Sequence, residues 1–73
     1  MDVCTLVGMN LRHYRKKAGL TQEQLADEAK SSSYYISCLE RGKENVGIRT
    51  LERLCKPLRI SVALLFQPVP KEK

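Results

Sequence analysis

The chain has 73 residues and a formal net charge of +5, which predicts one domain with a modest core and indicates a polyanionic partner. Its three cysteines show no C-x-x-C spacing and its only histidine is His13, so the composition argues against a disulfide framework, a metal site and a cofactor. No apolar run approaches the ~20 residues that span a bilayer, and the first residues lack the features of a signal peptide. We therefore expect a cytoplasmic protein without membrane contact.

The first expected helix covers residues 3 to 18. Apolar side chains recur on one of its faces at spacings of four, three and four, at Val7, Leu11, Tyr14 and Ala18. Basic residues occupy much of the remaining surface between Arg12 and Lys17, a pattern that is typical of a solvated helix face. Gly19 ends the helix.

Residues 21 to 42 read as two short helices joined by a tight turn. Thr21 and Gln24 have the spacing of a capping box, which predicts the start of the second helix, and Ser32 predicts the N-cap of the third. Gly42 stands where a helix C-terminus favours positive φ. The expected outer face of the third helix presents Ser33, Tyr34, Ser37 and Cys38. Two short helices of this kind, with hydroxyls outward, have the geometry that enters a DNA major groove.

A loop from 42 to 47 leads into a fourth expected helix, which Pro57 should bend or end. Its apolar positions are Ile48, Leu51, Leu54, Cys55 and Leu58. Ser61 then caps a short fifth helix over 62–66, and residues 67–73 form a short C-terminal tail. Because no strand-like alternation is present, the predicted fold class is all-α, a bundle of five short helices.

The order of these residues resembles the Cro/Xre-like helix-turn-helix family of small bacterial and phage transcriptional regulators. The resemblance covers roughly residues 7 to 66 and identifies 1–66 as a lambda-repressor-like DNA-binding domain. Its carriers are Val7-Gly8, Leu11-Arg12, the run from Ala18 to Ala26, Tyr35-Ile36-Ser37, the run from Leu39 to Lys43, Thr50-Leu51, and Ser61 through Phe66.

The resemblance implies a set of DNA contacts. The glutamine matching Gln22 bonds a backbone phosphate and braces the reading helix, while the loop that contains Lys43 and Asn45 grips phosphate beside the groove. An arginine matching Arg15 often pairs with the glutamate matching Glu40. The residues implied to face base edges or flanking phosphates are Ser32, Ser33, Tyr34, Ser37 and Cys38.

The implied function is sequence-specific regulation of transcription. The partner is double-stranded DNA, and a homodimer reads an inverted-repeat operator through the third helix in the major groove. We expect no enzyme activity, because the chain has no Gly-rich phosphate loop and no nucleophile with a base. No small-molecule ligand is evident. The alternative is a protein-interaction module, such as an antitoxin or adaptor domain, with weak or no DNA binding of its own.

The chain departs from the family pattern at the turn and at the end of the fourth helix. Lys30 and Ser31 replace a glycine and a small apolar residue, and Lys30 must then adopt a left-handed backbone at a cost of about 1 kcal/mol. Arg59 replaces the usual helix-ending glycine, and Asn45 precedes Val46 instead of a proline.

Several positions have more than one interpretation. Tyr34 is the better candidate to touch DNA and Tyr35 the better core residue. Cys38 is either an oxidation-sensitive thiol in the groove or a small side chain that merely fits.

The expected dimer interface includes the fifth helix and the segment around it. Val62, Leu65 and Phe66 suit the core by spacing, which leaves Leu64 facing outward, with Ala63 and Val69 as further candidates. The alternative is a monomer with one surface leucine.

Overall fold

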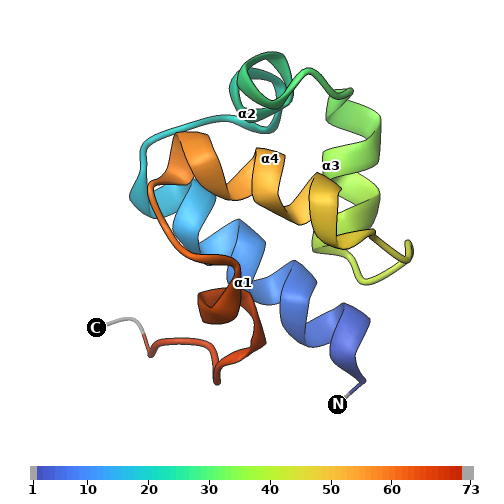
Figure 1. The fold of residues 1–73 in the computed structure, drawn as a ribbon, viewed down its shortest axis with the longest axis vertical. Helices are drawn as coiled ribbons and strands as arrows, with labels where there is room; N and C mark the ends of the chain where they lie inside the picture. Colours follow the sequence, from blue (N-terminus) through green and yellow to red (C-terminus); the bar gives the residue numbers. More distant parts are fainter. Residues whose placement is uncertain (1, 72–73) are drawn as a thin grey trace.

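The computed structural model describes residues 2–71, and Figure 1 shows how its helices are arranged. The elements in chain order are α1 (Val3–Lys17), α2 (Gln22–Ala29), α3 (Ser33–Glu40), α4 (Ile48–Leu58) and the 3-10 helix η1 (Val62–Phe66). No strand occurs among these residues, which confirms the all-α prediction. Met1 and the last two residues of the predicted tail, 72 and 73, lie outside the described range.

Side-chain caps begin α2 and α3 where the sequence predicts them. The Thr21 hydroxyl accepts from the Gln24 backbone nitrogen at 3.0 Å, and the Gln24 side chain accepts from the Thr21 nitrogen at 2.9 Å. This reciprocal pair is a complete capping box. The Ser32 hydroxyl likewise accepts from the Tyr35 nitrogen at 3.1 Å. Both caps are confirmed.

Left-handed residues end all four α-helices. Gly19 has φ 75° just after α1, and Gly42 has φ 72° just after α3. Lys30 has φ 56° at the end of α2, and Arg59 has φ 57° at the end of α4. The strained backbone predicted at Lys30 is therefore confirmed. Pro57 lies in the last turn of α4, and the helix ends one residue later, at Leu58.

The core draws on every helix. Its fully buried apolar side chains are Leu11, Leu25, Ile36, Leu51, Leu54 and Leu65. Helix α1 packs against α3 and η1, while α2 packs against α3 and α4. Burial also raises the pKa of the Cys55 thiol to about 11, as expected for a structural cysteine. No helix within residues 2–71 is long and apolar enough to cross a membrane.

Helices α1 and α3 approach so closely that their backbones touch at Gly8. A Cβ atom at this position would collide with the carbonyl oxygen of Leu39 and would lie 3.0 Å from that of Glu40. Gly8 therefore sets the distance between α1 and the third helix.

The fifth element differs from the prediction, because it is a 3-10 helix of five residues. Ser61 provides no side-chain cap, and backbone hydrogen bonds at both ends of the segment span three residues, from the Leu64 nitrogen to the Ser61 oxygen at 3.1 Å and from the Gln67 nitrogen to the Leu64 oxygen at 3.3 Å. A 3-10 helix places residues three apart on one face, so Leu65 is fully buried with Val62 beside the core. Phe66 turns away and is 41% exposed, and Leu64 is half-buried. The expectation that Phe66 points inward is wrong.

Candidate nucleic-acid interface

The outer face of α3 consists of uncharged polar side chains. Tyr34 is 74% exposed, Ser33 is exposed and Ser37 is half-buried. Tyr35, in contrast, packs against the core, as predicted. Helix α3 itself carries no basic residue. Positive charge flanks it instead, with Lys30 before the helix and Lys43 after it. Such a face can donate and accept hydrogen bonds between flanking cations.

Tyr34 presents a neutral phenol at neutral pH, as an ordinary tyrosine does. A hydrogen bond with Cys38, followed by the charge of that cysteine, raises the pKa of Tyr34 above its ordinary value. Its one hydroxyl hydrogen can be donated to one acceptor at a time, either Cys38 or a phosphate or base edge of DNA.

Cys38 does not share this exposure, and the prediction of a groove-facing thiol is wrong. The residue is 6% exposed, because longer neighbours on the same helix face cover its small side chain. Arg41 lies over it, with Nη2 3.8 Å from Sγ, and Tyr34 approaches from the preceding turn. The interpretation as a small side chain that fits is the one the geometry supports.

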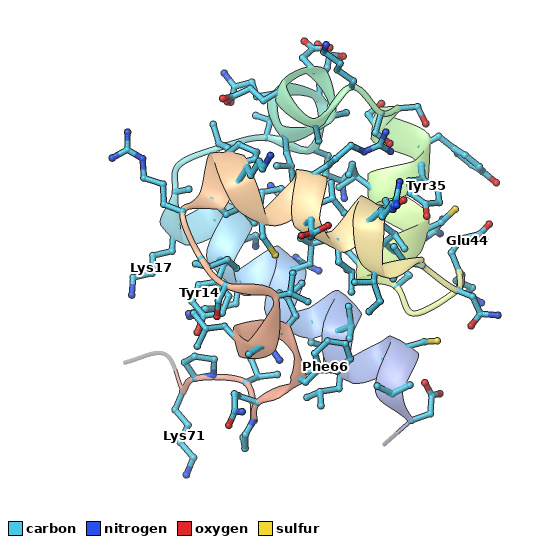
Figure 2. The ribbon with its side chains drawn as sticks, in the orientation of Figure 1. Tyr14, Lys17, Tyr35, Glu44, Phe66 and Lys71 are labelled. Carbon is cyan, nitrogen blue, oxygen red and sulfur yellow. The ribbon has the colours of Figure 1, made fainter. Side chains whose placement is uncertain are left out.

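Ser32 and the α3–α4 loop border the same face. Ser32 is exposed and its oxygen already accepts the cap hydrogen bond, which leaves its O–H free to donate outward. Lys43 and Asn45 are exposed in the loop. The Asn45 side-chain oxygen accepts from the Cys4 thiol at 3.2 Å, so the loop is tied to the start of α1. Figure 2 shows Glu44 at this edge, pointing away from the body of the molecule.

A buried ion pair lies behind this face. Arg15 Nε donates to Glu40 Oε2 at 2.6 Å, and its Nη2 donates to Oε1 at 3.0 Å, while Nη1 donates to the Leu20 carbonyl at 2.8 Å. The two side chains are 9% and 4% exposed. The pairing suggested by the family resemblance is confirmed.

Gln22 also bonds to this pair. The family resemblance implies that Gln22 braces the third helix, but it does not name Glu40 as its partner. Gln22 is the first residue of α2 and is half-buried, and its Nε2 donates to Glu40 Oε1 at 3.2 Å. One carboxylate therefore connects α1, α2 and α3.

An apolar groove lies beside α1 and α4, next to the polar face. Three exposed apolar side chains line it: Val3 is 55%, Ile48 is 63% and Phe66 is 41% exposed. Figure 2 shows Phe66 beside the N-terminal half of α1. The floor of the groove includes Val7 and Leu51. Within the described part of the chain, no group of three or more His, Cys, Asp or Glu side chains is arranged to hold a metal ion.

A family profile described as a helix-turn-helix domain matches residues 6–65. The chain belongs to this family. It is 40% identical over 68 residues to an HTH-type transcriptional regulator, y4dJ, of Sinorhizobium fredii, an alignment that covers 93% of this chain and 88% of that relative.

Two solved structures of helix-turn-helix proteins have the same fold. The restriction-modification controller protein C.AhdI from Aeromonas hydrophila aligns with a TM-score of 0.83 at 33% identity, over 86% of this chain and 96% of its own. SinR, the master regulator for biofilm formation, was solved in complex with DNA. It aligns with a TM-score of 0.79 at 32% identity, over 84% of this chain and 98% of its own.

Proposed function

We propose that the protein regulates transcription by binding double-stranded DNA, with α3 in the major groove. The observation that carries this proposal is the exposed hydroxyl face of α3, set by a capped α2 and flanked by cations. Membership in the helix-turn-helix family and the likeness to SinR in its DNA complex support it. The protein is then a binding protein and not an enzyme, and it acts in the cytoplasm.

In this proposal, Ser33, Tyr34 and Ser37 reach base edges in the groove. The contacts to phosphate come from Gln22, Ser32, Lys43 and Asn45. Phosphate contacts fix the position of the protein, and only the base contacts read sequence. Cys38 is left out of both sets because its thiol is covered.

DNA binding with purified protein tests the proposal. Replacing Gln22 by Ala should weaken binding to all sequences alike, whereas Tyr34→Ala should change the sequence selected from a random duplex library. Ser33→Ala should likewise change the selected sequence. The matched control for Ser33→Ala is Ser61→Ala, because Ser61 is an exposed serine without a side-chain cap bond. If the protein shifts no DNA even at low salt, the alternative of a protein-interaction module is correct.

We further propose that the protein is a homodimer that reads an inverted repeat, with the apolar groove as its interface. Three exposed apolar side chains from α1, α4 and η1 converge on this groove, and a convergence of this kind marks an interaction surface. A two-fold dimer is the commonest way to cover such a surface. It would place the two α3 helices one turn of DNA apart, about 34 Å.

Sedimentation at micromolar concentration tests the dimer. Phe66→Ser should shift the protein toward monomer and weaken operator binding. Met9→Ser is the matched control, because Met9 is 42% exposed but lines a different hollow on α1. A wild-type protein that sediments as a monomer would contradict the interface.

A further inference from the structure

We propose that Glu40 is a positioning residue that orients the Gln22 side chain for its contact with DNA. Arg15 offsets the negative charge of Glu40, which would otherwise repel the DNA phosphates. The inference rests on the proposed phosphate contact of Gln22. It assigns to the buried ion pair a role in binding, beyond its role in holding α1 against α3.

The geometry brings three helices to one carboxylate. Glu40 is the last residue of α3, Gln22 is the first residue of α2, and Arg15 lies in the last turn of α1. The Glu40 oxygen Oε1 accepts from Gln22 at 3.2 Å and from Arg15 at 3.0 Å. The residues are 18 and 25 positions apart in sequence, so only the folded bundle brings them together.

The hydrogen-bond chemistry of an amide gives this contact its consequence. Phosphate oxygens only accept, so Gln22 can bind phosphate only through its Nε2 group, which carries two hydrogens. One of them is donated to Glu40, and this bond fixes which end of the amide is the donor. The second hydrogen remains for the phosphate. A glutamine without this anchor would also present its oxygen, which phosphate repels.

A carboxylate near a phosphate would by itself oppose binding. Arg15 meets Glu40 with two nitrogens, at 2.6 and 3.0 Å, and so offsets its negative charge at close range. Glu40 can therefore orient Gln22 without repelling DNA. An uncharged hydrogen-bond acceptor at position 40 should orient Gln22 just as the carboxylate does. A variant of this kind therefore tests the orienting role of residue 40 separately from its charge.

The test uses two double variants that remove the same two charges. Arg15→Met with Glu40→Gln keeps an acceptor oxygen at position 40, and Arg15→Met with Glu40→Met removes it. Well-packed apolar side chains of similar volume often replace a buried ion pair without loss of stability. Arg15→Met also removes the donor to the Leu20 carbonyl, and it does so equally in both double variants. Gln22→Ala is then added to each variant and to the wild type, and affinity for one duplex is measured at fixed salt.

In the wild type and in the variant with Glu40→Gln, Gln22→Ala should weaken binding about tenfold, the effect of one hydrogen bond to a charged group. In the variant with Glu40→Met it should weaken binding less than about twofold, because Gln22 is no longer oriented there. Circular dichroism confirms that each variant is folded. An equal effect of Gln22→Ala in all three backgrounds would overturn the positioning role while leaving the phosphate contact intact.

A measurement on the wild type covers the case in which the variant with Glu40→Met does not fold. Side-chain amide NMR signals of Gln22 should show one hydrogen already bonded without DNA, and the second should shift when a duplex is added. Two amide hydrogens that both show the chemical shifts of a solvated glutamine side chain in the free protein would overturn the inference. If Gln22→Ala leaves wild-type binding unchanged, the phosphate contact itself fails, and the inference fails with it.

Discussion

The helix-turn-helix segment and the η1 segment acquire their structures in different ways. In the first, Thr21 and Ser32 bond to backbone groups three residues away, and each begins a helix. In the second, Ser61 makes no such bond, and η1 is held by distant groups. A side-chain cap defines a helix start whatever packs on it, while an uncapped segment takes its shape from the surface on which it docks.

Asn10 is the distant group that holds η1. It is fully buried in α1, and its Nδ2 donates to the Leu65 carbonyl at 3.0 Å and to the Gln67 carbonyl at 2.7 Å. Its Oδ1 is the one buried side-chain oxygen or nitrogen without a hydrogen-bond partner within residues 2–71. Asn10 therefore acts as a tertiary anchor, because its amide group ties the η1 segment to α1.

The largest expected effect is at the contact between α1 and the helix-turn-helix. Gly8→Ala should destabilise the protein by about 3 kcal/mol, because the added Cβ meets backbone atoms of α3 that cannot move separately. Urea unfolding monitored by circular dichroism measures this. Gly47→Ala is the control: its Cβ would meet no atom within 4 Å, and the loss should stay below about 1 kcal/mol. Similar losses in both variants would contradict the close helix contact.

The anchor of η1 gives the next effect. Asn10→Ala should cost about 2 kcal/mol, since it leaves the buried Leu65 carbonyl and the partly buried Gln67 carbonyl without their donor. It should also speed hydrogen exchange of η1 amides before those of α2 and α3. Glu52→Ala, at an exposed position on α4, serves as the control. If η1 amides exchanged as slowly as in the wild type, the anchor would not hold this segment.

The turn between α2 and α3 offers a gain in stability. Lys30→Gly should stabilise the protein by about 1 kcal/mol, because Lys30 has φ 56° and glycine adopts this backbone without a steric cost. Lys56→Gly, inside α4, should destabilise it by a similar amount, since glycine is a poor helix former. Thermal unfolding of the two variants should therefore change in opposite directions. The same direction in both would contradict the strain at Lys30.

The smallest effect concerns the cap of α1. The backbone N–H of Thr5 bonds to Asp2 at 3.0 Å and lowers the pKa of that carboxyl group. A lowered folded-state pKa contributes stability above the unfolded value, 3.8, and this contribution is lost as pH falls through the folded value. Stability should therefore decrease slightly below about pH 4. Asp2→Asn keeps the cap without titrating, and an unchanged acid profile in that variant would contradict the assignment.

The sequence by itself determined the features that depend on near neighbours. The starts of α2 and α3 and the end of α4 after Pro57 follow from residues within a few positions of each other. Family resemblance supplied the left-handed backbone at Lys30 and the pairing of Arg15 with Glu40, and the structure confirms both. The residues proposed to touch DNA stay predictions, because their roles depend on a partner.

Only the tertiary structure decided what lies between distant segments. Cys38 is covered by Arg41, Phe66 turns outward on a 3-10 helix, and Gly8 meets the backbone of α3. Gln22 reaches Glu40 across 18 residues. Helical periodicity predicts which way a side chain leaves its own helix, but burial and hydrogen bonding depend on what another segment places there. For this reason the helices of this protein could be predicted from its sequence, whereas the hydrogen-bond network around Gln22 could not.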